Sequence, residues 1–265
     1  MASDDLLDVE AAGMNCMIGI GYEQVWLGSE DSSIYIIDAL TMTCNKRLVG
    51  HRNQVSDMIQ EETEENGDTI SQIYSCSLDG SILLWDPGLM EIKSQFQLPQ
   101  CWRLTSILLH HDHIWCCVEY SLLVLARDGT QIQEVTLTPS PEGSSNLMTD
   151  FLIIPQRDEL WVVCSQRANL YIWKTDDLKD PIETIPLPGC SNITCMIHVK
   201  NQVWVGGGGT TNNGKGCIYI INSECYSLEK ELEAPCGGIG ALCSAEDRYV
   251  LSGTQDSKAI IWKVD

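Results

Sequence analysis

Short apolar runs of six residues recur along the chain, with polar and turn-forming segments between them. One such run is found six times, once every 40 to 48 residues, as SIYIID (33–38), SILLWD (81–86), SLLVLA (121–126), NLYIWK (169–174), CIYIIN (217–222) and KAIIWK (258–263). Repeats with a period of roughly 40 residues are typical of propellers and arrays. The pattern therefore predicts a succession of similar structural units.

A second apolar run precedes each of these runs. Its six copies are QVWLGS (24–29), QIYSCS (72–77), HIWCCV (113–118), ELWVVC (159–164), QVWVGG (202–207) and RYVLSG (248–253). Both kinds of run are rich in β-branched and aromatic residues and are bounded by turn residues, which predicts strands. A further apolar stretch such as MNCMIGI (14–20) comes before, and a more polar one such as KSQFQLP (93–99) comes after. We therefore expect four strands in each unit.

Helices contribute little to this prediction, because no segment shows a convincing helical period of sufficient length. The two most helix-like stretches, GLMEIKSQF (88–96) and ECYSLEKELEA (224–234), occupy the place of a fourth strand. Six units of four strands predict an all-β propeller. Its blades are expected at about residues 13–50, 51–99, 100–145, 146–189, 190–235 and 236–265.

The last of these units ends after its third strand, which leaves its outer edge without a partner. An open edge of this kind invites mispairing. Either the N-terminal segment 1–12 closes a six-bladed ring, or the closing strand and a seventh blade lie upstream in a longer polypeptide. We favour the second alternative, because the segment offers only the short and acidic stretch LLDVE.

The charge of the chain narrows the choice of partners. Thirty-seven acidic residues face sixteen basic ones, which gives a formal net charge of −21. Such a charge repels phosphate backbones and anionic lipids, so nucleic acid and direct membrane insertion are not expected. A basic protein surface is compatible with it, since the charge would speed the encounter.

The cysteines and the apolar runs indicate in which cellular compartment the protein is expected. Thirteen cysteines would suggest a disulfide framework in a small secreted chain, but this chain has 265 residues and an acidic N-terminus that is unlike a signal peptide. A reducing compartment is the better fit. No apolar run reaches the roughly 18 to 20 residues of a membrane-spanning helix. We expect a cytoplasmic protein.

A glycine-rich stretch, GTTNNGKG (209–216), comes within one residue of a phosphate-binding loop. That loop needs a strand before it, a helix after it and a hydroxyl following the lysine. Here Gly216 replaces the hydroxyl residue, and the strand-like run CIYIIN follows in place of a helix. We interpret the stretch as a flexible insertion in a turn, and we predict no nucleotide or other cofactor.

Two other polar clusters invite a functional reading. The stretch HHDHIWCC (110–117) has metal-ligating side chains, but Cys116 and Cys117 should point to opposite faces of a strand, so no metal site is predicted. The acidic run 61–68 is expected to be a solvated loop that could hold a basic partner. We predict no catalytic residues and no enzyme, because neither a nucleophile elbow nor a pair of carboxylates stands out.

The second unit resembles the WD40 repeat family, on the residues Gly50-His51 and SCSLDGSILLWD (75–86). The resemblance implies that His51, Ser75, Asp79 and Trp85 form the hydrogen-bonded tetrad that buttresses a WD40 blade, with Ser77 as an alternative to Ser75. The other units match less well. Asp31 and Asp256 keep the turn aspartate, whereas Tyr120 and Arg167 stand in its place elsewhere.

Several further segments, among them VWLGSEDSSIYIID (25–38) and CSAEDRYVLSG (243–253), look like the C-terminal WD40 region of a DENN domain-containing protein. This resemblance implies that the chain belongs to a guanine nucleotide exchange factor for a Rab GTPase, acting in endosomal traffic and autophagy, and placed peripherally on endosomal membranes through the parent protein. The exchange activity would lie in a DENN module that is absent here, so the Rab GTPase would be a partner of that module.

Taken together, these patterns predict a non-catalytic propeller that binds other proteins through loops held in fixed geometry. The face we expect to be used contains Asp31, Asp79, Asp256, Gly208 and Lys215. The alternative is a propeller that binds a small ligand, or hydrolyses a substrate, in its central channel. Among the first strands considered, only Asp150 and His198 offer strong acid–base groups for that alternative.

Overall fold

The computed structural model describes residues 13–65, 68–98, 103–118, 121–136, 148–164, 167–209 and 215–264. The N-terminal segment 1–12, which was expected to bear on closure, lies outside these ranges. The chain divides into two compact units, with the boundary between Glu134 and Val135. Each unit is built from antiparallel sheets, and the predicted all-β, WD40-type propeller fold is confirmed.

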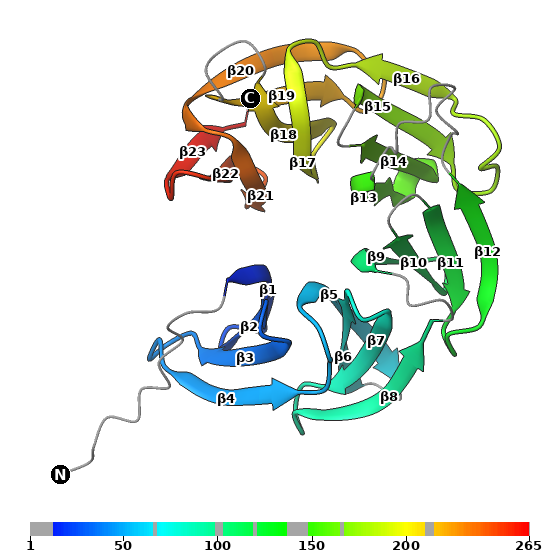
Figure 1. Cartoon of the computed structure of the whole chain (residues 1–265), viewed down its shortest axis with the longest axis vertical. Coiled ribbons are helices and arrows are strands. Elements are labelled where there is room, and N and C mark those ends of the chain that lie inside the picture. Colours follow the sequence, from blue (N-terminus) through cyan, green and yellow to red (C-terminus); the bar gives the residue numbers. More distant parts are fainter. Residues whose placement is uncertain are drawn as a thin grey trace. The chain divides into compact units, whose positions relative to one another are not determined.

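The first unit contains three four-stranded sheets that follow the order of the chain (Figure 1). We call them blades one, two and three. Their strands are β1 (Met14–Ile20), β2 (Gln24–Ser29), β3 (Ser33–Asp38) and β4 (Cys44–Val49), then β5 (Val55–Glu65), β6 (Asp68–Ser77), β7 (Ser81–Asp86) and β8 (Glu91–Gln97), then β9 (Leu104–His110), β10 (His113–Val118), β11 (Ser121–Ala126) and β12 (Gln131–Thr136).

The second unit contains two four-stranded sheets and one three-stranded sheet, which we call blades four, five and six. Their strands are β13 (Met148–Ile154), β14 (Glu159–Cys164), β15 (Arg167–Lys174) and β16 (Glu183–Pro186), then β17 (Cys190–Val199), β18 (Gln202–Gly209), β19 (Lys215–Asn222) and β20 (Leu228–Gly237), then β21 (Ile239–Ala245), β22 (Tyr249–Thr254) and β23 (Ala259–Lys263). A short 3-10 helix, η2 (Pro155–Arg157), joins β13 to β14.

The strand predictions agree closely with this arrangement. The second runs at 24–29, 113–118 and 159–164 coincide with β2, β10 and β14. The helix-like stretch at 224–234 contributes to β20, which is a strand, as its place in the repeat required. Blade six has three strands among the residues described, in line with the expectation from its sequence.

The core of each unit lies between neighbouring blades. One cluster joins blades one and two and includes Trp26, Ile36, Leu83 and Trp85, with the two indole rings in an edge contact at 6.4 Å. Similar clusters join blades two and three, four and five, and five and six. Because a middle strand is covered on both faces, it reads as a continuous apolar run, as β14 shows with all six residues buried.

The first strands of neighbouring blades lie against each other within each unit. Each first strand carries a β-bulge at an equivalent position, for example between Val55 and Asp57 in β5 and between Met148 and Asp150 in β13. A bulge bends and twists a strand locally and redirects a side chain. Next to these two bulges, the carboxylates of Asp57 and Asp150 accept backbone N–H groups of the next blade.

Candidate functional site

The four residues of the predicted blade-two tetrad come together around the His51 ring. Nε2 of His51 lies 2.7 Å from the Ser75 hydroxyl, which also accepts a hydrogen bond from the Trp85 indole at 2.8 Å. Nδ1 of His51 lies 2.7 Å from the Ser81 hydroxyl and 3.9 Å from the Asp79 carboxylate. A hydroxyl can both donate and accept, so two serines can satisfy both nitrogens of a neutral imidazole.

Ser77, the alternative to Ser75, has a different position. Its hydroxyl donates to the Asn53 carbonyl at 3.0 Å and accepts the Asp79 N–H at 3.1 Å. Gly80 completes this turn with a positive φ of 78°, a conformation that glycine adopts without steric cost. Ser77 therefore fixes the turn, while Ser75 contacts the histidine.

Burial controls the charge of this cluster. It lowers the pKa of His51 to about 4, against the opposing effect of the Asp79 carboxylate. Burial also acts to raise the pKa of Asp79, but the hydrogen bonds from Ser81 and from the Arg52 N–H outweigh it and leave this pKa below its usual value. At neutral pH the histidine is therefore uncharged, and its contact with Asp79 is not an ion pair.

Asp31 occupies the equivalent turn of blade one and has several partners. Its carboxylate accepts hydrogen bonds from the Ser33 N–H at 3.0 Å, the Tyr35 hydroxyl at 2.7 Å and the Arg47 guanidinium at 3.0 Å. Burial acts to raise the pKa of Asp31, and hydrogen bonds from Tyr35, Ser33 and Ser29, that of Tyr35 foremost, bring it below its usual value. The turn presents a carboxylate, a phenol and a guanidinium in fixed positions.

The remaining predicted residues lie in the second unit. Asp256, in the β22–β23 turn, accepts hydrogen bonds from Lys258 at 2.7 Å and Thr254 at 2.6 Å, and these lower its pKa to about 2. Lys215 begins β19 and pairs with Gly237, where an added Cβ would lie 3.5 Å from Asp256. Gly208 pairs with Gly216 across β18 and β19. The predicted face thus consists of two groups of turns, one in each unit.

The glycine-rich stretch joins β18 to β19, as the repeat predicted. A strand follows it, so the helix terminus on which a phosphate loop depends is not there. Residues 210–214 of this stretch lie outside the described residues.

The expectation of a solvated loop at 61–68 was wrong for most of that run. Residues Glu61 to Glu65 are the end of β5, and they pair with β6 in a two-stranded ribbon that extends beyond the point where β7 joins the sheet. At the base of the ribbon Glu61 forms an ion pair with Arg127 of blade three at 2.7 Å, and the Arg127 guanidinium lies over the Tyr74 ring. Cross-strand pairing, supported by this anchor, outweighs the repulsion between neighbouring carboxylates.

Sequence reasoning missed Asp57, which the bulge of β5 directs toward blade three. Its carboxylate accepts hydrogen bonds from the Ser106 hydroxyl at 2.7 Å and the Ile107 N–H at 3.0 Å. Asp150 has the equivalent role in the second unit, where it accepts the Met196 N–H of blade five at 2.7 Å. The signal was present as the pairs Ser56-Asp57 and Thr149-Asp150. Both carboxylates link neighbouring blades, which removes Asp150 as a ready acid–base group for a channel reaction.

A second missed feature is the buried carboxylate of Glu159, at the start of β14. It receives hydrogen bonds from Arg157 at 3.0 Å, Lys174 at 3.1 Å and the Tyr226 hydroxyl at 2.7 Å. Burial acts to raise the pKa of Glu159, and these donors together lower it. A buried charge requires such partners. No local sequence pattern shows the network, because Tyr226 is 67 residues away in the chain.

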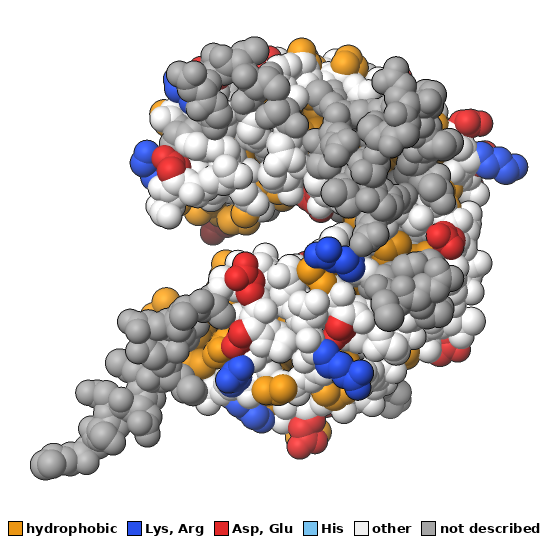
Figure 2. Space-filling view, in the orientation of Figure 1, with side chains coloured by type: hydrophobic (Ala, Val, Ile, Leu, Met, Phe, Trp, Pro, Cys, Tyr) orange, Lys and Arg blue, Asp and Glu red, His pale blue; other side chains and the backbone are white. Residues whose placement is uncertain are grey.

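Surface charge is mixed rather than segregated on the face visible in Figure 2. Over the blue and cyan blades of Figure 1, basic and acidic side chains alternate with hydrophobic ones. Among the residues that the structure describes, no helix is long and apolar enough to span a bilayer. These surfaces offer several chemically distinct contacts to a macromolecular partner.

Three comparisons with known proteins agree with this geometry. Residues 42–86 match the WD domain, G-beta repeat. The computationally designed Ika8 protein has a similar fold, with a TM-score of 0.64 and 16% identity, over 95% of this chain and 71% of that one. DENN domain-containing protein 3 of Mus musculus is 42% identical over 260 residues, which cover 97% of this chain and 20% of the relative.

The chain therefore spans about one fifth of the length of that relative. The match between residues 42 and 86 includes His51, Ser75, Asp79 and Trp85, so the family pattern and the hydrogen-bonded cluster fall on the same blade. The chain is a WD40-type propeller chain, related over nearly its whole length to a segment of DENN domain-containing protein 3.

Proposed function

We propose that this chain is a non-catalytic interaction module that presents its turns and its acidic ribbon to protein partners. It would do so within a DENN-type exchange factor for a Rab GTPase, acting in endosomal traffic and autophagy. The observation that supports this most is the rigid positioning of polar turn residues, such as Asp31 with its three partners. Binding residues concentrate on loops that a rigid scaffold holds in place.

The similarity to one segment of DENN domain-containing protein 3 supports the link to nucleotide exchange. In this proposal the exchange reaction takes place in a module outside this chain, and the propeller holds or regulates that module. The carboxylates of Asp57 and Asp150, which hold neighbouring blades together, and that of Glu159, which is buried among cations, have structural roles in the proposal. We propose His51 and its partners as a blade-stabilising cluster on the same grounds.

Affinity capture tests the interaction function. The immobilised chain is compared with a variant in which a two-residue turn replaces residues 209–216, and with a variant in which Glu62 and Glu64, exposed on the ribbon, become lysine. We expect a reproducible set of partners that one of these changes depletes. Identical partner sets for all three proteins would exclude both segments as recognition elements, and capture of no partner by the unchanged chain would refute the proposal.

An exchange assay tests the link to the Rab GTPase. In the mouse relative, this chain replaces the corresponding segment, and GDP release from a Rab GTPase is compared with that of a version lacking the segment. We expect the chimera to keep the exchange rate of the relative and the deletion to change it. Acceleration of GDP release by this chain alone would contradict the non-catalytic assignment.

A further inference from the structure

A polar hollow of about 360 Å³ lies within the second unit, where three connections meet. Its walls come from η2, from the β17–β18 turn and from the β19–β20 turn. The lining includes Arg157, His198, Lys200, Ser223 and Glu224. This volume is at the lower end of the range of small-ligand sites.

Arg157 is held firmly on one side of the hollow. Its guanidinium donates to Glu159 at 3.0 Å and to the Tyr226 hydroxyl at 2.7 Å, and it stacks over the Tyr226 ring at 5.4 Å. Lys174 shares the same carboxylate at 3.1 Å. The group formed by Arg157, Lys174 and Glu159 therefore carries one net positive charge, and within the hollow itself Arg157 and Lys200 lie opposite the single carboxylate of Glu224.

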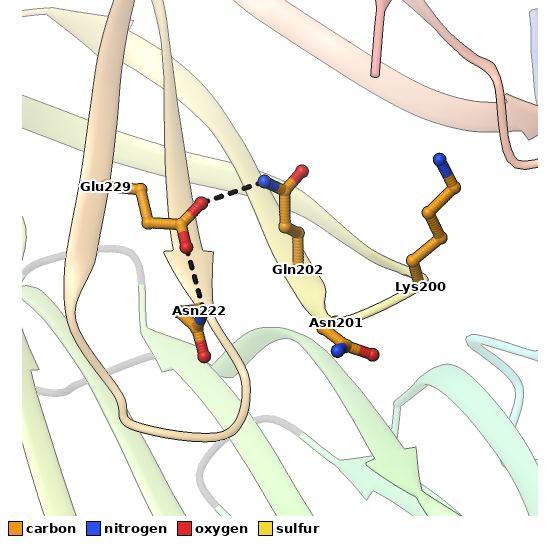
Figure 3. Close-up of a pocket in the computed structure, with 5 residues that line it drawn as sticks. All are labelled: Lys200, Asn201, Gln202, Asn222 and Glu229. Atoms are coloured by element: carbon orange, nitrogen blue, oxygen red, sulfur yellow. Dashed lines mark hydrogen bonds between the residues drawn. The ribbon is translucent and has the colours of Figure 1, made fainter. Parts of the chain in front are cut away.

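Lys200 lies in the β17–β18 turn and has no hydrogen bond or ion pair with any residue that the structure describes. Its φ of 53° fixes the backbone in the left-handed region, at the corner of the turn. Figure 3 shows its side chain directed away from Glu229, whose carboxylate is occupied by Gln202 and Asn222, both at 2.8 Å. The ammonium group is therefore available to an external anion.

His198 and Glu224 also line this hollow, and a second hollow shares part of its lining. Nε2 of His198 is buried without a hydrogen-bond partner among the described residues, and buried polar atoms of this kind normally have one. The Glu224 carboxylate, which also lines the hollow, accepts a hydrogen bond from Asn201 at 3.0 Å, which fixes its position and leaves its charge in place. A second hollow of about 320 Å³ shares Lys200 and Asn201 and is also lined by Glu229 and by the amides of Gln202 and Asn222. Each of these two amides donates one N–H to Glu229 and has a second N–H left to donate. Amide groups of this type match the hydrogen-bonding groups of a peptide backbone.

We propose that Lys200, together with Arg157, forms a docking site for an acidic side chain of a partner peptide. The anionic oxygens would contact Lys200 in the first hollow, and the peptide backbone would cross the amide-lined second hollow. This inference rests on the proposed interaction function and names the chemistry of one partner segment. The net charge of −21 makes it specific, because acidic peptides are repelled by the rest of the molecule.

The test measures fluorescence anisotropy of labelled peptides with four glutamates, with four glutamines, or with two phosphoserines. Lys200→Asn removes the charge and tolerates the left-handed backbone, and Lys200→Arg retains the charge. Lys179→Asn removes an equal charge from an exposed site in the same unit. We expect saturable binding of an anionic peptide that Lys200→Asn weakens about tenfold, while Lys179→Asn changes it less than about twofold.

Four results would overturn the inference: no saturable binding to the unchanged chain, equal binding of the glutamine peptide, equal loss with Lys179→Asn, or no recovery with Lys200→Arg. A thermal melt of each variant shows that it is folded. Partner capture with the unchanged chain runs in parallel. If partners are captured but no anionic peptide binds, the docking site fails and the interaction function stands, whereas absence of capture refutes the interaction function.

Discussion

Individual side chains in this protein hold one another within a blade and also hold the backbone of turns and of neighbouring blades. Ser75 serves both His51 and Trp85, and Asp57 accepts a backbone N–H from the next blade. These contacts are short and buried or partly buried, and each one satisfies a group that would be costly to leave unpaired. At this scale most of these contacts reinforce the structure, whereas the exposed Lys200 has no side-chain partner among the described residues.

The buried His51 makes a specific prediction about pH. Its folded pKa of about 4 lies below the ordinary value of 6.5, so the unfolded state binds more protons between these values. The contribution of neutral His51 to the free energy of unfolding is therefore complete above pH 6.5 and is lost as the pH falls toward 4. The loss from this residue should reach about 3 kcal/mol at pH 4, at about 1.4 kcal/mol for each pH unit.

Urea unfolding at several pH values measures this effect. His51→Gln provides the comparison, because the difference between the two proteins removes the contributions of other groups, including His198, whose pKa burial also lowers. We expect the stability advantage of the unchanged chain to shrink steadily between pH 6.5 and pH 4. A constant difference across this range would show that His51 is not held in its neutral form by the fold.

At the scale of elements, a bulged first strand packs against a glycine of the preceding blade at two places, Gly28 and Gly206. A Cβ on Gly206 of β18 would lie 2.7 Å from a methyl carbon of Ile239, and one on Gly28 of β2 would lie 2.8 Å from Val55. Gly253 of β22 has the equivalent register opposite its own bulge, at Ala241. A Cβ there would meet no atom within 4 Å. Because Gly206 and Gly28 have no side chain, the first strand of the next blade can pack closely against them.

Gly206→Ala should therefore destabilise the fold by about 1 to 3 kcal/mol, the usual cost of overpacking a filled interface. Gly253→Ala is the matched control, since it makes the same chemical change at the equivalent position with open space around it. Equilibrium denaturation of the two variants measures the difference. Equal changes in the free energy of unfolding would rule out close blade packing as the reason for Gly206.

Much of this element structure was predictable from sequence, and the exceptions have physical causes. The β2, β10 and β14 strands follow from short apolar runs between turn residues, which are local signals. The ribbon formed by residues 61–65 was missed, because an acidic run reads as a loop until its pairing with β6 and its anchor at Arg127 are known. Glu159 and Tyr226 were missed for a related reason, since their contact joins two blades.

For the molecule as a whole, thiol chemistry gives an independent test of burial. Of the 13 cysteines in the sequence, 11 have described side chains and are free. Cys225 and Cys243 are exposed, and hydrogen bonding with Ser227 lowers the pKa of Cys225. By contrast, burial raises the pKa of Cys195 to about 12. Reactivity follows thiolate content and access, so the thiols should separate into fast and slow groups.

Titration with 5,5′-dithiobis(2-nitrobenzoate) measures this separation. In the native protein we expect Cys225 to react first, and Cys225→Ser should remove that fastest phase, while Cys243→Ser should leave it intact. After denaturation without a reducing agent, all 13 thiols should react. Fewer than 13 would indicate disulfides, and persistence of the fastest phase in Cys225→Ser would contradict the assigned reactivity.

The core is divided into clusters, each shared by two neighbouring blades, and this division limits how far a destabilising core substitution acts. Trp204 belongs to the cluster between blades five and six, and Trp161 to the cluster between blades four and five. When each repeat contacts only its neighbours, stability approximates a sum of repeat terms and interface terms. A destabilising substitution at Trp204 therefore acts first on the interface between blades five and six. It affects other interfaces only through the blades that lie between them. Such a molecule can accumulate sequence change blade by blade while the rest of its framework persists.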